Sequence, residues 1–504
     1  MTSRSFARAS TAVLALLAAE TAYADVTASQ VWDRVQQALD IYGEDAITIG
    51  SEETSGDTLT VSDLAMRIED ETGMVTTIEI DSVTFTEQGD GTVEVVYPAS
   101  MPFTVTGESN DGEPFTVGLA IVLDGMDVVA SGSPEDLVFD YTGDRYAIEL
   151  VSIEGSGEIP DMDAMIELTG IEGSSNVTEE SGQSVAYDLS ADAMAFNFDM
   201  PSPEVEGEFI RANGTIDGVA ITSNSVLPDG VDLSDPAQIY QEGVSATGGY
   251  TTGQANYVVD VLVDGQAFNG TMSSDGGQTD VNIVDGAFAY SGNVSNLQVN
   301  AAGDAVPFPI EVGMEQYAFG MTAPVIATED ARDIGLLLNF ENLTMSDMIW
   351  QIFDPGEVLP RDPITVLMDL TGQARMTTDL VDPEAMENLA GPPGELEALT
   401  LNGLRISAAG AEVTGEGAFT FDNENPAPQF GGMPQPTGEV TFDLSGINTL
   451  MDNLVQMGIV PEEQLMGPRM MMGMFTTPTG EDSMTSTIEI NEEGHVLANG
   501  QRIQ

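Results

Sequence analysis

The stretch Val75-Thr76-Thr77-Ile78-Glu79-Ile80-Asp81-Ser82 alternates in a way that decides the fold class. Successive side chains of a β-strand point to opposite faces, so Ile78 and Ile80 share one face while Glu79 and Asp81 share the other. β-branched residues, which favour strands, are frequent here. The pattern predicts a strand with one buried and one solvated face.

Turn signals recur at short spacing on both sides of this stretch. Asp-Gly and Gly-Asp pairs supply the positive φ that tight hairpins need, so most neighbouring strands are predicted to be antiparallel. The pairs occur at Gly89-Asp90-Gly91, Asn110-Asp111-Gly112, Asp124-Gly125, Gly143-Asp144, Asp217-Gly218, Asp264-Gly265, Asp275-Gly276-Gly277 and Asp285-Gly286. Few helices interrupt the pattern, with candidates at residues 235–242, 346–353 and 383–389. The pattern disfavours a doubly wound α/β fold, because that fold needs a helix after most strands.

Helices are predicted at both ends of the chain. Thr27 and Gln30 have the spacing of a capping box, and the apolar positions that follow recur at helical spacing up to a stop at Gly43. These positions are Val31, Val35, Leu39 and Tyr42. Residues 446–475 are predicted to form a short helical pair that reverses near Gly458, with a terminal hairpin after it.

The predicted fold class is therefore mainly β, an elongated, curved antiparallel sheet or meander with an N-terminal amphipathic helix and a short C-terminal helical pair. Residues 25–504 are interpreted as a single β-rich body. The alternative is a sub-boundary near residues 227–234, because Pro228, Gly230 and Pro236 cluster there.

The first 24 residues have the three parts of a secretory signal. Arg4 and Arg8 precede an apolar stretch, and Ala22-Tyr23-Ala24 places small residues before a cleavage point. We expect cleavage after Ala24 and a periplasmic location. No later run of 18 or more apolar residues occurs, so no transmembrane segment is expected after cleavage. The alternative is that the signal segment is retained and anchors the chain in the membrane.

The charge balance excludes several partners. The chain has 84 Asp and Glu against 12 Lys and Arg, a formal charge of −72, and every cation is arginine. Such a field repels nucleic acids and anionic lipid headgroups. We interpret it as a solvation feature, such as an adaptation to salt, with cation binding as the alternative. The 42% hydrophobic content still predicts a folded core, and the absence of Cys excludes thiol chemistry.

The residue inventory removes many enzyme mechanisms. With one His and no Lys, the chain has no His-pair zinc motif, Schiff base or P-loop lysine. The single His495 falls in a predicted turn, and no G-x-S-x-G motif occurs. Acid pairs for glycoside hydrolysis could form at Asp161-Met162-Asp163 or Asp422-Asn423-Glu424. Loops 229–232 and 275–280 could hold Ca²⁺, although ordinary turns are the better interpretation. We therefore assign no catalytic, cofactor or metal residue.

A methionine cluster stands near the C-terminus. It comprises Met466, Met470, Met471, Met472 and Met474, followed by Phe475. Core packing between helices is the leading interpretation, because consecutive methionines point in different directions around a helix. An apolar groove for a lipid or partner, formed by Met466, Met470, Met471, Met474 and Phe475, is the functional alternative. Thioether ligation of Cu(I) is the third, without His or Cys to assist.

The chain's end resembles a family of alphaproteobacterial exported proteins, the domain of unknown function 2125 family. The resemblance is carried by Glu481-Asp482-Ser483-Met484-Thr485-Ser486-Thr487-Ile488-Glu489-Ile490, Leu497-Ala498-Asn499-Gly500-Gln501-Arg502, Gly415-Glu416-Gly417-Ala418, Pro436-x-Gly438 and Asn453-Leu454-Val455-Gln456-Met457-Gly458. It is expected to cover most of the mature chain and implies no catalytic residue. The layout is also loosely similar to AsmA-like and YdgA-like envelope proteins, some of which are linked to membrane-lipid homeostasis.

These observations lead to a functional expectation. We expect a non-catalytic periplasmic envelope protein that binds a lipid or another apolar envelope component, because alternating strands can carry one apolar face. One alternative is a structural or protein-interaction module with a filled core. Another is a carboxylate-dependent glycan hydrolase. The sequence does not specify the ligand or the oligomeric state.

Overall fold

The structure is a computed structural model, and it describes residues 26–39, 46–69, 73–108, 112–155, 162–179, 182–202, 205–228, 230–231, 236–240, 243–304, 306–389, 391–426 and 434–504. The predicted signal segment lies outside these residues. So do Tyr42 and Gly43 of the predicted first helix, and Asp161, Asp229 and Asp232 of the candidate acid and calcium loops.

Residue contacts divide the chain into two compact units. Unit 1 comprises Met1–Ile159 and Thr169–Glu180, and unit 2 comprises Pro160–Leu168 and Ser181–Gln504. The sequence favoured a single body, with a sub-boundary near residues 227–234 as the alternative. The division falls instead near residues 160–181. Strand β12 (Phe209–Pro228) is paired with β11 (Gly182–Pro201) up to Pro228, and a strand paired along its length is not a linker.

Both units are mainly β, and their described strands pair antiparallel, which confirms the predicted fold class. In unit 1, β3 pairs with β1, β2 and β4, and the sheet continues through β5 to β9. The strands are β1 (Ile47–Thr48), β2 (Ser51–Ser55), β3 (Thr58–Glu69), β4 (Val75–Glu87), β5 (Val93–Val96), β6 (Ser100–Glu108), β7 (Pro114–Asp124), β8 (Asp127–Ser133) and β9 (Asp136–Glu154). Strand β10 (Asp163–Glu179) contributes residues to both units.

Unit 1 has a buried hydrophobic core. Helix α2 (Ala28–Leu39) begins with the predicted capping box, in which the Thr27 amide donates to Gln30 Oε1 at 2.9 Å and the Gln30 amide donates to Thr27 Oγ1 at 3.3 Å. Its inner face places Val31 and Trp32 against the sheet. The Trp32 ring lies 5.6 Å from that of Phe85. The core comprises Val26, Ala28, Val31, Trp32, Leu59, Val61, Leu64, Val83, Phe85, Val93, Val95, Ala130 and Leu137.

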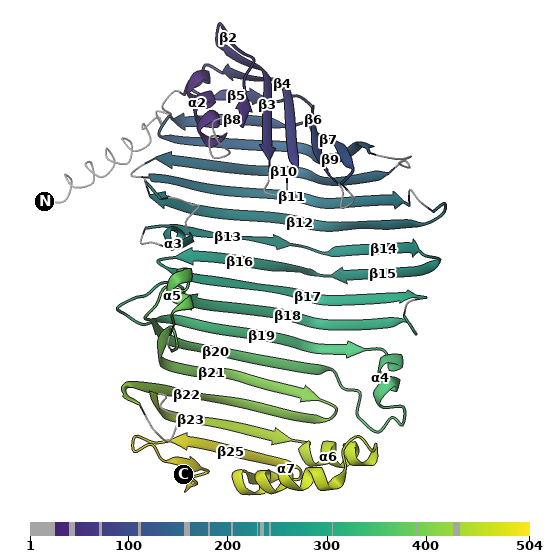
Figure 1. Ribbon diagram of the computed structural model, residues 1–504, viewed down its shortest axis with the longest axis vertical. Helices are drawn as coiled ribbons and strands as arrows, with labels where there is room; N and C mark the ends of the chain where they lie inside the picture. The colour runs from purple at the N-terminus through teal and green to yellow at the C-terminus, as the bar shows by residue number, and fades with distance from the viewer. Residues whose placement is uncertain are drawn as a thin grey trace, which may run out of the picture. The chain divides into compact units, whose positions relative to one another are not determined.

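In unit 2, neighbouring strands follow chain order from β11 to β12 and again from β17 to β23, followed by β25, while β13 to β16 form two side-by-side pairs, β13 with β16 and β14 with β15, between β12 and β17 (Figure 1). β13 and β14 together span the length of β12, and β16 and β15 together span that of β17. The strands after β12 are β13 (Ser245–Thr252), β14 (Ala255–Val263), β15 (Gln266–Ser274), β16 (Gly276–Val284), β17 (Ala287–Gly303), β18 (Ile310–Pro324), β19 (Arg332–Met345), β20 (Ile364–Met376), β21 (Gly394–Ala408), β22 (Ala411–Pro426), β23 (Pro434–Ser445), β24 (Thr477–Gly480), β25 (Ser483–Ile490), β26 (Val496–Ala498) and β27 (Gln501–Arg502). Strands β25 and β26 form the predicted terminal hairpin.

Several long strands contain one residue with positive φ, and their alternation changes phase there. In β3, Leu59 and Val61 are buried before Asp63 (φ 52°) and Leu64 after it. Asn296 in β17 (φ 50°) and Asn342 in β19 (φ 51°) occupy the same kind of position. Asn and Asp tolerate this left-handed conformation better than other non-glycine residues. The phase change keeps apolar side chains of both strand halves on one face.

Short helices sit at the strand ends of unit 2, as predicted. They are α3 (Pro236–Ile239), α4 (Asp347–Phe353), α5 (Pro383–Glu387), α6 (Ile447–Gln456) and α7 (Glu462–Phe475). Helix α6 is capped from a distance, because the Asp482 carboxylate accepts the amides of Asn448 at 3.1 Å and Thr449 at 2.9 Å. Within the described residues, every helix is too short or too polar to cross a membrane.

Candidate functional site

One face of the unit 2 sheet carries three rows of apolar side chains that run across the strands. Each row is fixed by strand register, so residues far apart in sequence stand opposite one another. The first row contains Tyr290, Met321, Leu336, Leu370, Leu401, Val440 and Ile488. The second contains Phe319, Leu338, Met368, Leu404 and Phe442, and the third contains Tyr317, Phe340, Val366, Ile406, Val413, Leu444 and Met484. We call these three rows the apolar face.

None of the side chains of the apolar face is buried. Met321 is 47% exposed, Leu336 41% and Ile406 45%. Each side chain is therefore shielded only in part. Unit 1 differs, because helix α2 covers its sheet and produces a buried core. No charged residue interrupts the three rows. Where a strand contributes no large apolar side chain to a row, the position is taken by Gly417 in the first row and by Gly415 and Ser486 in the second.

Aromatic rings form a connected cluster at one end of the apolar face. The ring centroids of Tyr290 and Phe319 are 4.9 Å apart, those of Tyr317 and Phe319 5.8 Å, and those of Tyr317 and Phe340 5.2 Å. Further along, the Phe442 ring lies over Gly415, where an added Cβ would come within 2.6 Å of it. The rings thus cover neighbouring backbone and make a continuous apolar surface.

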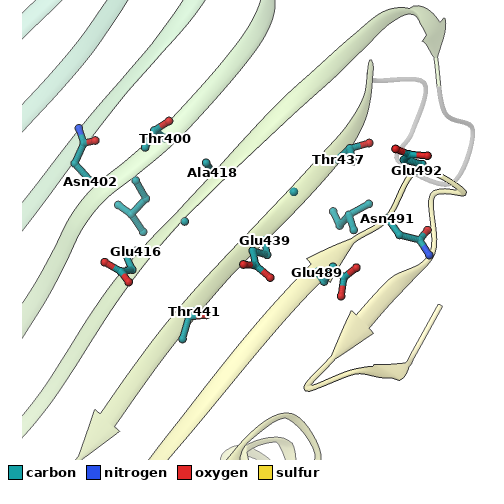
Figure 2. Close-up of a pocket in the computed structure, with 14 residues that line it drawn as sticks. Thr400, Asn402, Glu416, Ala418, Thr437, Glu439, Thr441, Glu489, Asn491 and Glu492 are labelled. Atoms are coloured by element: carbon teal, nitrogen blue, oxygen red, sulfur yellow. The ribbon is translucent and has the colours of Figure 1, made fainter.

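The opposite face of β21, β22, β23 and β25 carries mostly polar side chains and holds a pocket of about 700 Å³ (Figure 2). Glu439 and Glu489 stand directly opposite each other on β23 and β25, and Glu416 lies on the neighbouring β22. No arginine lines the pocket. Like charges at directly opposed positions destabilise a sheet, so this pair is unfavourable for the fold. The pocket lining comprises Thr400, Leu401, Asn402, Glu416, Gly417, Ala418, Thr437, Gly438, Glu439, Thr441, Glu489, Ile490, Asn491 and Glu492.

The methionine cluster does not pack as its leading interpretation predicted. Met466, Met470, Met471 and Met474 of α7 are 54–66% exposed, so the expectation of core packing is wrong for these four. Met472 and Phe475 are partly buried, and Leu465 is the buried residue of the helix. The candidate set is therefore divided, with Phe475 partly buried and the four methionines exposed. The expectation was based on the three consecutive residues Met470 to Met472, which point in different directions around a helix. Met466, Met470 and Met474, however, are spaced by four residues and share one side of the helix.

The other sequence candidates have local partners. Asp163 accepts Asn197 Nδ2 at 3.1 Å, and Asp422 accepts the Glu424 amide at 3.0 Å within strand β22 rather than in a loop. In the candidate calcium loop, Asp275 accepts from Asn296 and Asp280 from Gln278. His495 Nδ1 lies 3.2 Å from Glu493. Among the described residues, no group of three or more His, Asp or Glu side chains is placed to hold a metal ion.

Sequence reasoning missed the apolar face as a connected surface and the Glu439–Glu489 pair. Local alternation shows that each strand has an apolar side, but not which residues of different strands stand opposite one another. Two signals were present: apolar runs that change phase at Asn296 and Asn342, and acids among the alternating polar positions of the last strands.

Comparison with known proteins gives one finding. Residues 264–500 match the model of a family described as "Uncharacterized protein conserved in bacteria (DUF2125)". No curated protein and no solved structure matches the chain. The matched range contains all three rows of the apolar face, the polar pocket and α7, and it confirms the resemblance predicted from the C-terminal sequence for this part of the chain. Residues 264–500 are thus similar to the domain of unknown function 2125 family.

Proposed function

We propose that the protein is a non-catalytic periplasmic envelope protein whose apolar face binds the acyl chains of a lipid. The observation that carries the proposal is the set of three register-aligned apolar rows of which no member is buried. Folded proteins rarely leave an apolar patch of this extent in water unless it meets a ligand or partner.

The composition of the apolar face favours an acyl chain over a polar ligand. The rows contain no charged side chain that could pair with a phosphate or a carboxylate, so a bound lipid would keep its headgroup at the margin. Met321, Met368 and Met484 are interspersed among branched and aromatic side chains. Methionine adapts its shape to irregular apolar surfaces, which suits flexible chains of varied length.

A periplasmic location accords with the secretory signal predicted at residues 1–24. In that compartment lipids pass through water between membranes, and an apolar surface that shields acyl chains has a use there. The acidic polar face would keep the protein in solution.

Native mass spectrometry of protein purified from its own periplasm, followed by lipid extraction, tests the proposal first. We expect a lipid at defined stoichiometry. Binding of a dansyl-labelled fatty acid to the purified protein then locates the site. Met321→Glu with Ile406→Glu should weaken this binding by about tenfold or more, because each change places a charge against the chain.

The matched control is Ser291→Glu with Thr420→Glu. Both residues are exposed on the opposite face, and the change in net charge is the same. Equal fatty-acid binding by the two double variants would show that the binding site does not lie on the apolar face. A clean apo mass together with no fatty-acid binding would favour the structural or protein-interaction module.

Glycan hydrolysis is a second candidate, favoured by one observation. Glu439 and Glu489 occupy directly opposed positions in the polar pocket, and a pair of carboxylates is the minimum for this chemistry. Release of reducing ends from purified peptidoglycan, lost in Glu489→Gln and Glu439→Gln but kept in Glu492→Gln, would support hydrolysis over lipid binding. The lipid-binding proposal predicts no release.

A further inference from the structure

Helix α7 exposes a stripe of methionines. Met466, Met470 and Met474 lie along one side of the helix, with Met471 beside them, and they are 66%, 65%, 63% and 54% exposed. Methionine is among the residues most often buried, so four exposed on one short helix are unusual. We call these four residues the methionine stripe.

The helix that carries the stripe is held firmly. The Phe475 carbonyl accepts Ser486 Oγ at 2.7 Å and Asn499 Nδ2 at 2.8 Å, and the Met472 carbonyl accepts the Thr476 amide at 2.9 Å. Leu465 is buried, and Arg469 pairs with Asp452 of α6. These anchors fix the inner side of α7, so the stripe is a fixed feature of the surface rather than a loose end.

The C-terminal end of α7 lies next to the apolar face. Thr476, which follows α7 directly, places its hydroxyl 3.3 Å from the Met484 sulfur. Met484 is the last residue of the third row, on β25, the strand beside α6 and α7 in Figure 1. Met474, two residues before Thr476, is therefore the stripe residue nearest in sequence to this contact with the apolar face.

We infer that the methionine stripe docks the protein on a zwitterionic lipid bilayer. The charge decides which bilayer: a chain of formal charge −72, with Glu462 and Glu463 at the start of α7, is repelled by anionic headgroups. The stripe contains no Trp, Tyr or unpaired Arg, the side chains that most often dominate binding between proteins. Its unbranched methionine side chains can adapt to disordered acyl chains. We further infer that docking transfers lipid onto the apolar face, and this part rests on the proposed function.

Flotation of the full-length protein with phosphatidylcholine vesicles tests the inference. Met470→Gln with Met474→Gln should lower the bound fraction by about fivefold or more, since two apolar side chains are removed from the contact. Gln keeps a similar helix propensity. The control is Met348→Gln with Met386→Gln, two exposed methionines on α4 and α5, which should bind as the unaltered protein does. Adding about 30% phosphatidylglycerol should weaken binding of all proteins.

Binding of dansyl-labelled fatty acid from solution separates this inference from the proposed function. Loss of vesicle binding with fatty-acid binding retained supports docking by the stripe and shows that the variant is folded. Equal vesicle binding by the stripe and control variants overturns the inference. Fatty-acid binding without any vesicle binding by the unaltered protein overturns docking alone, whereas stripe-dependent vesicle binding without fatty-acid binding overturns the proposed function alone. A change in oligomeric state caused only by the stripe variant would assign the stripe to self-association and overturn docking.

Discussion

Single residues with unusual backbone conformations determine which way the side chains of unit 2 point. Asn296 has a φ of 50° in the middle of β17, and its side chain donates to Asp275 at 2.6 Å. The left-handed conformation costs most residues roughly 1–2 kcal/mol and costs Asn less. The phase change of β17 thus depends on a residue that tolerates positive φ.

Replacing this asparagine tests the point. We expect Asn296→Val to lower the free energy of unfolding by roughly 1–2 kcal/mol and Asn296→Gly to leave it nearly unchanged, because only the valine is strained there. Urea denaturation of both variants measures the difference. Equal losses would assign the role to the Asp275 hydrogen bond instead.

A second residue-scale effect concerns glycines beneath aromatic rings. Gly415→Ala should destabilise the protein by about 1–3 kcal/mol, because the new Cβ would come within 2.6 Å of the Phe442 ring. Gly403→Ala is the matched control, since its Cβ would meet nothing closer than Leu367 at 3.8 Å. Thermal unfolding of the two variants should show a loss only for Gly415→Ala.

At the scale of elements, distant side chains stabilise the helix ends. Burial raises the pKa of Asp482, but the hydrogen bonds from Thr449 and Asn448 outweigh it, and the net pKa lies below the usual value. A carboxylate with a lowered pKa in the folded state stabilises the protein above its unfolded pKa. That stabilisation is lost as the pH falls through the folded pKa.

The cap therefore has a predictable pH dependence. Asp482→Asn should be less stable than the unaltered protein at neutral pH, and the difference should shrink as the pH falls below about 4. Urea midpoints across this range measure it. A difference that stays constant down to about pH 2 would show that the charge of Asp482 has no part in capping α6.

In unit 1, helix α2 stabilises the fold by covering the hydrophobic core. Trp32 is 3% exposed, and its Nε1 donates to Glu52 at 2.9 Å. Trp32→Ala should cost about 3–5 kcal/mol through the cavity that it leaves. Hydrogen exchange of peptides from β3 to β5 should become faster, while peptides from β18 to β20 in unit 2 serve as the internal reference. Unchanged exchange in unit 1 would contradict a covering role for α2.

For the whole molecule, net charge opposes folding. A formal charge of −72 produces self-repulsion that salt screens. Raising NaCl from about 20 mM to about 500 mM should raise the unfolding temperature by several degrees. MgCl₂ at equal ionic strength gives the same shift if the effect is screening. A larger shift would indicate cation binding, the alternative to a solvation role for the acids.

Much of the fold could be predicted because its determinants are local. The capping box of Thr27 and Gln30, the helix starts near residues 346 and 461, and the terminal hairpin depend on neighbours in sequence, and all are present. The division into two units near residues 160–181 depends on contacts between distant strands, which local sequence patterns do not contain.

The sequence by itself determined that the protein is an antiparallel β protein with helices at named places, because alternation, turn chemistry and capping act over a few residues. It also carried the family resemblance of the C-terminal half. Only the tertiary structure decided that Tyr290, Leu338 and Met484 belong to one uncovered surface and that the methionines of α7 face outward. Register and exposure come from pairings between strands far apart in the chain, which no local pattern contains.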